Sequence, residues 1–348
     1  MQTVRAYAAL TGGAPLGPWQ VTRRDPGPHD VAVDIAYSGI CHSDIHQVNE
    51  EWGTASFPMV PGHEIVGTVT AIGDQVTRHL LGDLVGVGCF VDSCRECEAC
   101  LAGSENYCLT GKIAFTYNSK ELTSGDPTFG GYSQSIVVSE NYLLKVPGNI
   151  DAAGAAPLLC AGITLWSPLR HWQAGVGSRV AVMGLGGLGH MGVKLAKALG
   201  AEVTVLSHSA AKETNAYELG ADHFVNTSDP TSLRSIRSSF DLVLNTVSAD
   251  LDLTPYLNTL TLNGSLVLLG LPSKPIEFRA FTLLGLRRSV SASSIGGIQE
   301  TQEMLDFCGQ NNITSDVEVI AADYINEAYR RVLASDVRYR FVIDTATI

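Results

Sequence analysis

The chain has 348 residues, 45% of them apolar and 17% charged, and its formal net charge is -12. This length suits about two domains, and the acidic balance argues against nucleic-acid binding because it repels phosphate backbones. No apolar run reaches the roughly 18–20 residues of a membrane span and the N-terminus lacks a signal-like stretch, so we expect a cytoplasmic protein with reduced thiols.

Short alternating runs fill residues 1–150. The stretch DVAVDIAY places Val31, Val33 and Ile35 on one face of an extended chain, and EIVGTVTAIG and DLVGVGCFV follow between turn residues. Short strands separated by Gly, Pro and Asp are typical of an antiparallel barrel or sandwich.

A dense group of thiols follows in VDSCRECEACLAGSENYC, whose cysteines are Cys94, Cys97, Cys100 and Cys108. Disulfides are disfavoured in a reducing compartment. A ferredoxin-type run needs three residues before its last cysteine and a proline after it, whereas this chain has seven and Leu109. An iron–sulfur cluster is therefore the less favoured alternative, and we predict a closed, structural zinc lobe over residues 94–108.

Helical and apolar segments alternate over residues 151–285. Strand-like RVAVMGL, EVTVLS, FDLVLNTV and GSLVLLGL are separated by helix-like stretches such as HMGVKLAKALG. This alternation predicts a doubly wound parallel sheet. The pattern fades over residues 286–348, where one more helix (TQEMLDFCGQNN) and a final strand (YRFVID) are expected.

The strand RVAVMGL leads into GLGGLG, in which Gly184, Gly186 and Gly189 have the G-x-G-x-x-G spacing of a dinucleotide site. Leu185, Gly187 and Leu188 occupy the positions between these three glycines. In such a turn the glycines let the backbone approach a pyrophosphate and let the helix pack on the strand. A glycine-rich turn without a ligand is the alternative.

The second strand of this sheet ends in SHSAAK rather than in an acidic residue. A carboxylate there would bind the ribose 2′-hydroxyl of NAD. Here Ser207, His208, Ser209 and Lys212 offer hydroxyls and a cation, which suit the 2′-phosphate of NADP. Capping of the next helix is the alternative role of these residues.

A second set of potential metal ligands is scattered through the chain. GICHSDIH offers Cys41, His42, Asp44 and His46, PGHEIVG offers His63 and Glu64, and APLLCAGIT offers Cys160. No spacing rule joins them. A hydride-transferring enzyme gains from a Lewis acid that polarises an alcohol or carbonyl oxygen, and two thiolates with one imidazole leave zinc an open position for substrate.

Taken together, GICHSDIH, PGHEIVG, CRECEACLAGSENYC, LLCAGIT, GLGGLGH and DVRYRFVID make the chain resemble the zinc-containing medium-chain alcohol dehydrogenases, above all the NADP-dependent cinnamyl alcohol dehydrogenase branch. The resemblance runs almost end to end. It implies a GroES-like antiparallel β-barrel catalytic domain, a Rossmann NADP-binding domain, and a C-terminal segment that returns to the catalytic domain. The ligand set of two cysteines and one histidine is already known for alcohol dehydrogenases.

The resemblance also implies roles for individual residues. Cys41, His63 and Cys160 match the catalytic zinc ligands, and Glu64 matches a carboxylate that approaches the metal during ligand exchange. Asp44 would orient the ligand histidine.

Ser43 and His46 match the residues that move the substrate's proton. His42 and Arg340 match residues that face the pyrophosphate. Further positions that match cofactor-lining residues are Thr164, Thr246, Gly270, Ser293, Ser294 and Ile295.

We therefore expect an enzyme that transfers hydride between NADP(H) and primary alcohols or aldehydes, aromatic or medium-chain aliphatic, as a homodimer or homotetramer. A polyol or secondary-alcohol dehydrogenase is the alternative within the superfamily. A nucleic-acid-binding zinc protein and a silent NADPH-binding protein are the alternatives outside it. We expect Trp52, Tyr117, Trp166 and Ser294 in the substrate pocket or the core, and Cys89 and Cys308 as spare thiols.

Overall fold

The computed structural model describes residues 1–229 and 231–348. It divides into two compact units, one formed by Met1–Ile163 with Gly296–Ile348 and the other by Thr164–Ile295. The boundaries predicted at residues 150 and 285 therefore shift. The first lies later because the segment before Thr164 packs with the first unit, and the second lies later because Ser289–Ala292 forms a strand of the second unit's sheet.

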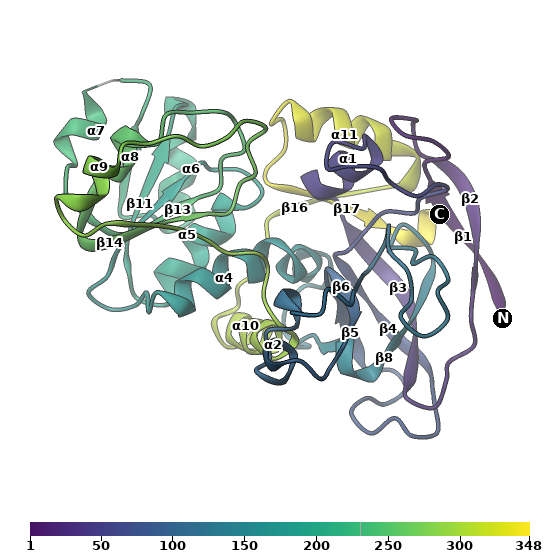
Figure 1. The fold of residues 1–348 in the computed structure, drawn as a ribbon. Coiled ribbons are helices and arrows are strands. Elements are labelled where there is room, and N and C mark those ends of the chain that lie inside the picture. The colour runs from purple at the N-terminus through teal and green to yellow at the C-terminus, as the bar shows by residue number, and fades with distance from the viewer. Residues whose placement is uncertain (230) are drawn as a thin grey trace. The chain divides into compact units, whose positions relative to one another are not determined.

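The first unit is built on a seven-stranded sheet of order β16-β17-β3-β4-β5-β9, with β8 also paired to β3 (Figure 1). All of its strand pairs are antiparallel except β16 with β17. The strands are β3 (Asp30–Gly39), β4 (Ile65–Ile72), β5 (Leu84–Val87), β8 (Ser135–Ser139), β9 (Leu144–Lys145), β16 (Val317–Ile320) and β17 (Arg340–Asp344).

Two small ribbons and several helices complete this unit. The ribbons pair β1 (Gln2–Ala8) with β2 (Gly17–Arg23) and β6 (Phe90–Ser93) with β7 (Ile113–Phe115). The helices are α1 (His42–Val48), α2 (Glu98–Leu101), α3 (Ala152–Ala155), α10 (Ile298–Asn311) and α11 (Ile325–Leu333). The short 3-10 turns are η1 (Glu105–Tyr107), η2 (Glu140–Tyr142), η3 (Ala156–Leu159), η5 (Ala322–Tyr324) and η6 (Thr345–Thr347).

The alternation seen in the sequence sets the core of this unit. Val31, Val33 and Ile35 on β3 are buried together, while the intervening Asp34 is exposed. The C-terminal segment adds to the same unit, because β17 pairs with β3 and carries Phe341 and Ile343 into a second buried cluster. Residues that are far apart in sequence therefore form one sheet.

The second unit is a six-stranded, fully parallel sheet of order β12-β11-β10-β13-β14-β15. Its strands are β10 (Arg179–Met183), β11 (Glu202–Ser207), β12 (His223–Asn226), β13 (Phe240–Asn245), β14 (Leu260–Leu268) and β15 (Ser289–Ala292). Helices surround it (Figure 1), namely α5 (Gly189–Ala198), α6 (Glu213–Glu218), α7 (Ser232–Ser235), α8 (Thr254–Leu257) and α9 (Ala280–Leu284), together with the short turn η4 (Ala210–Lys212). Helix α4 (Ala161–His171) contains the boundary between the units. The predicted α/β fold class is confirmed.

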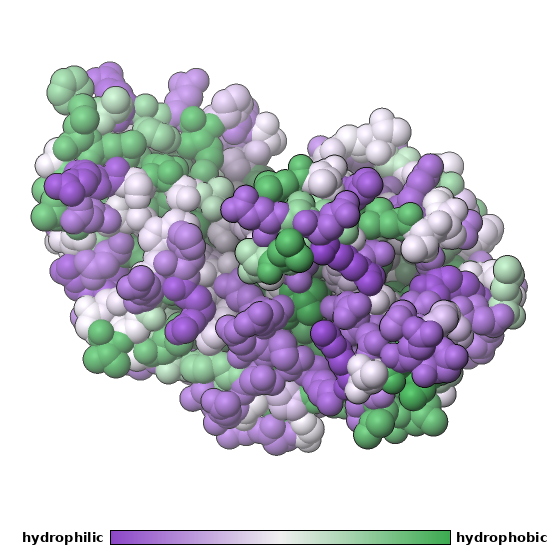
Figure 2. Space-filling model, turned by 60° about the horizontal axis from the view of Figure 1, so that its bottom comes forward, coloured by the Kyte–Doolittle hydropathy of each residue, from purple (hydrophilic) through white to green (hydrophobic). Residues whose placement is uncertain are grey.

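The face drawn in Figure 2 carries many hydrophilic side chains interrupted by separate hydrophobic patches. Isolated exposed apolar residues are normal on protein surfaces. Within the described residues no single helix is long and apolar enough to cross a membrane, although the bent pair Ala152–Leu159 and Ala161–His171 meets that test by length and composition.

A pair of neighbouring valines tests whether β17 is a core strand. Val342 on β17 is fully buried, whereas Val319, its register partner on β16, is 52% exposed. We expect Val342→Ala to lower the free energy of unfolding by about 2 kcal/mol, because it removes two buried methyl groups and leaves a cavity. The matched control Val319→Ala should cost about 0.5 kcal/mol or less. Equal shifts of the two urea midpoints would contradict this assignment of the core.

Candidate active site and metal centres

The four clustered cysteines of the sequence converge in space. The sulfur atoms of Cys94, Cys97, Cys100 and Cys108 all lie within 4.8 Å of one another. Cys94 follows β6, Cys97 precedes helix α2, Cys100 lies on that helix, and Cys108 follows η1. All eight cysteines of the chain are free thiols, so the disulfide alternative does not describe this lobe.

The surroundings of these sulfurs shift the pKa values of Cys108 and Cys100 in opposite directions. The amide of Leu109 donates to Sγ of Cys97 and the amide of Cys97 donates to Sγ of Cys94, each at 3.4 Å. The hydroxyl of Thr110, 3.3 Å from Sγ of Cys108, lowers the pKa of that thiol to about 6, whereas burial raises the pKa of Cys100 to about 12. A cation at the centre would keep the buried Cys100 ionised, so four thiols without a carboxylate fit a structural zinc.

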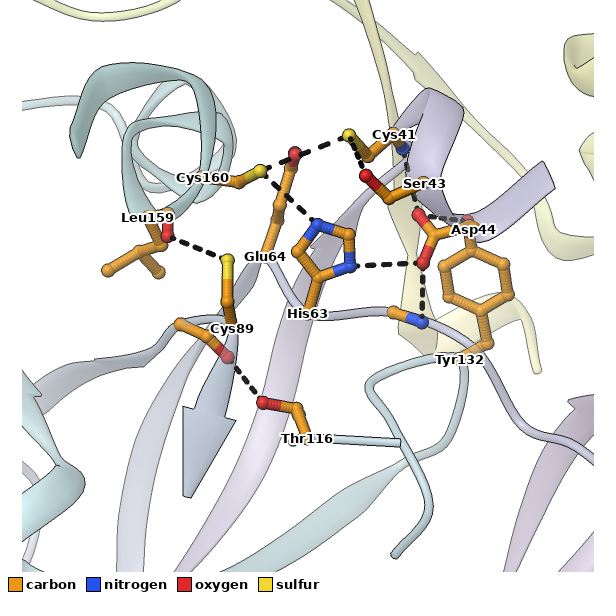
Figure 3. Close-up of polar contacts among 12 residues, drawn as sticks. Cys41, Ser43, Asp44, His63, Glu64, Cys89, Thr116, Tyr132, Leu159 and Cys160 are labelled. Carbon is orange, nitrogen blue, oxygen red and sulfur yellow. Dashed lines mark hydrogen bonds and ion pairs between the residues drawn. The ribbon is translucent and has the colours of Figure 1, made fainter. Parts of the chain in front are cut away.

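A second group forms from three separate parts of the chain (Figure 3). Cys41 is the N-cap of α1, His63 and Glu64 lead into β4, and Cys160 caps the end of η3. The ligand atoms of these four buried residues lie within 4.8 Å of one another. Sγ of Cys160 is 3.9 Å from Sγ of Cys41 and 3.3 Å from Nε2 of His63.

Asp44 fixes the orientation of the histidine in this group. Its Oδ1 lies 3.1 Å from Nδ1 of His63, and its Oδ2 accepts the amide N–H of Cys41 at 2.8 Å in a capping box of α1. Nδ1 of His63 therefore carries the proton, and Nε2 faces the thiols. Burial acts to lower the pKa of His63, but the Asp44 carboxylate outweighs it and holds that pKa well above its ordinary value.

Glu64 pairs with Arg340 across the same unit, from β17. Both side chains are buried, and Oε2 of Glu64 has no hydrogen-bond partner. Burial raises the pKa of Glu64 to about 7, although Arg340 opposes the shift. An orphaned, buried carboxylate oxygen beside two thiols and an imidazole fits a zinc ion. The predicted contact of Arg340 with a pyrophosphate would have to compete with this ion pair.

Helix α1 presents two further polar side chains. The hydroxyl of Ser43 lies 3.5 Å from Sγ of Cys41. One turn on, Nδ1 of His46 lies 2.5 Å from Oε2 of Glu51, and its ring stacks on Trp52 with 4.9 Å between the centroids. Glu51 was not found from the sequence, where the only signal was an acidic pair four and five residues after His46.

The glycine-rich turn has the backbone that its motif predicts. Gly184 directly follows β10 with a φ of 86°, a value that favours glycine. A Cβ on Gly189 would lie 2.0 Å from the carbonyl oxygen of Gly184, so helix and strand pack too closely for any side chain. A Cβ on Gly186 would meet nothing within 4 Å, which leaves this backbone open to a ligand.

The polar residues after β11 lie beside that turn. Ser207 ends the strand and its Oγ accepts the amide N–H of Ser209 at 3.2 Å. Nζ of Lys212 donates to the carbonyl oxygen of Leu185 at 2.8 Å, which places the ammonium group over the glycine-rich turn. His208 is exposed. No acidic residue lies between Ser207 and Lys212.

The other predicted cofactor residues divide between the two units. His42 and Arg340 belong to the first. The second contains Thr246, whose hydroxyl donates to the carbonyl of Met183 at 2.7 Å, and also Thr164, Gly270, Ser293, Ser294 and Ile295.

The remaining cysteines and aromatic residues have structural partners. Sγ of Cys89 lies 3.8 Å from the carbonyl oxygen of Leu159, and Cys308 is buried on α10. Tyr117 stacks on His63 with centroids 5.8 Å apart, and Trp166 is buried on α4.

Known proteins match the chain over most of its length. Residues 27–148 match the family described as alcohol dehydrogenase GroES-like domain, and residues 187–310 match zinc-binding dehydrogenase. The NADP-dependent alcohol dehydrogenase C of Mycobacterium bovis is 59% identical over 348 residues, which is 100% of both chains. Aldehyde reductase YahK of Escherichia coli is 52% identical over 99% of each chain.

Among solved structures, the CAD from Helicobacter pylori complexed with NADP(H) has a TM-score of 0.92 and 40% identity, and the match covers 99% of this chain and 98% of the other.

Cysteine variants should separate the two metal centres. We expect Cys97→Ala to lose one of two zinc ions and to lower the melting temperature by at least about 4 °C, because a closed zinc site contributes folding free energy. Cys41→Ala should lose the other zinc ion and keep its melting temperature close to that of wild type. The measurements are elemental analysis and thermal unfolding.

Cys308→Ala is the control, since it removes a buried thiol outside both clusters and should retain two zinc ions. Wild-type protein with one zinc ion, or Cys97→Ala with two, would contradict the assignment.

Proposed function

Because the chain belongs to the zinc-binding alcohol dehydrogenase family, we propose that it interconverts primary alcohols and aldehydes with NADP(H), using one catalytic and one structural zinc ion. The observation that carries this proposal is the buried group of Cys41, His63 and Cys160 beside the hydroxyl of Ser43. Names of relatives at 59% and 52% identity support both the alcohol and the aldehyde side of the reaction.

Cys41, His63 and Cys160 would hold the catalytic zinc, and the four cysteines of the 94–108 lobe the structural one. A zinc ion with two thiolates and one imidazole supplies a Lewis acid that lowers the pKa of an alcohol or polarises a carbonyl. Glu64 keeps a carboxylate oxygen free near the thiols, and its pair with Arg340 limits how far that oxygen can move.

We infer a proton path from Ser43 toward His46 on α1. The hydroxyl of Ser43 accepts the proton that leaves the alcohol and passes it toward His46, which is three residues further on. Nδ1 of His46 donates to Glu51, so Nε2 is the atom that receives a proton. His46 is 22% exposed and can exchange that proton with solvent.

The glycine-rich turn and the residues after β11 would bind the dinucleotide. The nicotinamide supplies the hydride chemistry, and the chain positions it. The open backbone at Gly186 and the first amides of α5 suit a pyrophosphate. Ser207, Ser209 and Lys212 suit a 2′-phosphate, because hydroxyls and an ammonium group donate charge-assisted hydrogen bonds to it.

Substrates of this proposed enzyme would be aromatic or medium-chain aliphatic. We place the enzyme in the cytoplasm, where its eight free thiols would remain reduced.

We also propose that the chain self-associates through the second unit. Strand β15 ends the parallel sheet, and helix α9, which precedes it in the chain, exposes Phe281 at 84% and Leu284 at 69%. An open strand edge and exposed large apolar residues each favour an interface, and a second copy supplies the same edge for pairing. A homodimer is the simplest assembly with this contact, and a homotetramer would need a further surface.

Cofactor preference tests the phosphate assignment. With one aldehyde as substrate, wild-type kcat/KM should favour NADPH over NADH by at least about tenfold, which requires about 1.4 kcal/mol. Ser207→Asp should move the preference strongly toward NADH, because its carboxylate repels the 2′-phosphate and can accept a hydrogen bond from a free 2′-hydroxyl. Steady-state rates with both cofactors measure both effects.

Ser238→Asp is the matched control. It adds the same charge at an exposed serine before β13, at the amino end of a parallel strand rather than at the carboxyl end where Ser207 lies, and should leave the cofactor ratio unchanged. Wild-type protein that favours NADH would overturn the assignment of this loop, and absence of alcohol or aldehyde activity with either cofactor would overturn the proposed function.

A further inference from the structure

The carboxylate of Asp44 is completely buried and accepts hydrogen bonds on both oxygens. Oδ1 is 3.1 Å from Nδ1 of His63 and accepts the amide of Gly62 at 3.1 Å. Oδ2 accepts the amide of Cys41 at 2.8 Å and the hydroxyl of Tyr132 at 3.3 Å (Figure 3). Three of these donors lie on or beside proposed zinc ligands. The fourth, Tyr132, is remote from them in sequence.

Tyr132 is fixed to the segment that carries His63. Its amide donates to the carbonyl of Pro61 at 3.0 Å, and the amide of Gly131 donates to the carbonyl of Gly62 at 2.8 Å. The ring packs so closely that a Cβ on Gly62 would lie 2.6 Å from Cδ1 of Tyr132. Movement of Tyr132 therefore displaces the backbone next to His63.

The contact continues to the C-terminal segment. Tyr329 on α11 is buried, and its hydroxyl donates to the hydroxyl of Tyr132 at 3.4 Å. Burial raises the pKa of both phenols well above their ordinary values, so both remain protonated. A carboxylate only accepts hydrogen bonds, which fixes the direction of donation from Tyr329 to Tyr132 to Asp44.

We propose that Tyr132 and Tyr329 are positioning residues whose hydroxyls form a chain onto Asp44 and so hold His63 in the orientation that binds zinc. This inference rests on the proposed catalytic zinc. Groups that orient a ligand histidine from outside the coordination sphere typically change metal affinity by 10–100-fold. The two tyrosine contacts are long, so we expect effects near the lower end of that range.

The test is zinc release from the full-length, two-zinc protein to the chelating dye 4-(2-pyridylazo)resorcinol, with alcohol oxidation followed in parallel. The zinc whose release accompanies loss of activity is the one of interest. Tyr132→Phe keeps the ring and removes only the hydroxyl, and it should release this zinc about tenfold faster. Tyr329→Phe should have a smaller effect, because it acts through Tyr132.

The double variant distinguishes a chain from two independent contacts. If Tyr329 acts through Tyr132, the double variant should release zinc at the rate of Tyr132→Phe alone. Tyr142→Phe is the matched control, since it removes another buried phenol hydroxyl of the same unit; that hydroxyl is bonded to Ser93 at 2.8 Å, and Ser93 lies 3.1 Å from Sγ of Cys100, so any effect on zinc should fall on the ion of the cysteine lobe. It should leave the activity-linked release unchanged, which separates positioning from general loss of stability.

Wild-type protein with fewer than two zinc ions would contradict the proposed function itself. Two-zinc protein in which Tyr132→Phe releases zinc at the wild-type rate, or in which the two tyrosine effects add, would overturn this inference alone. If Tyr132→Phe does not fold, Tyr329→Phe decides, because a release rate equal to that of wild type contradicts the chain.

Discussion

The first unit buries two thiols, an imidazole and a carboxyl group in one place, and this concentration of ionisable groups is the constraint that shapes its centre. Cys41, Cys160 and Glu64 each carry negative charge when ionised, and Arg340 is the cation that pairs with Glu64. The contact between the two thiols lowers the pKa of Cys41 well below its ordinary value and raises the pKa of Cys160 well above its ordinary value. A zinc ion would allow both sulfurs to be thiolates and would balance charges that are otherwise costly to bury.

The residues of this buried group come from parts of the fold that are distant from one another in sequence. Helix α1 supplies Cys41 and Asp44, the segment before β4 supplies His63 and Glu64, and Cys160 follows η3. The C-terminal strand β17 brings Arg340 beside β3, which makes the last residues of the chain part of the site. The capping box of Asp44 shows how one carboxylate can begin a helix and orient a ligand at once.

Local sequence patterns predicted part of the fold and part of the candidate site. The spacing of four cysteines predicted their cluster, and the glycine motif between a strand and a helix predicted the turn at Gly184. Alternating apolar residues predicted the buried face of β3.

The grouping of Cys41, His63 and Cys160 into one site could not be derived from their spacing in the sequence. Only the family resemblance connected them. The ion pair of Glu64 and Arg340 spans 276 positions and the contact of Tyr132 with Tyr329 spans 197, so no sequence window contains either. The observed boundaries between the units differ from the expected ones for a similar reason, since strand pairing and packing decide which unit a segment joins.

The central claim is that Cys41, His63 and Cys160 bind a zinc ion separate from that of the cysteine lobe. An anomalous difference map from a crystal of the zinc-loaded protein, collected at the zinc absorption edge, tests it most directly. The account predicts two peaks per chain. One should lie about 2.3 Å from the sulfurs of Cys41 and Cys160 and about 2.0–2.1 Å from Nε2 of His63, and the other should lie among the four lobe sulfurs. A single peak, or a second peak away from His63, would contradict it.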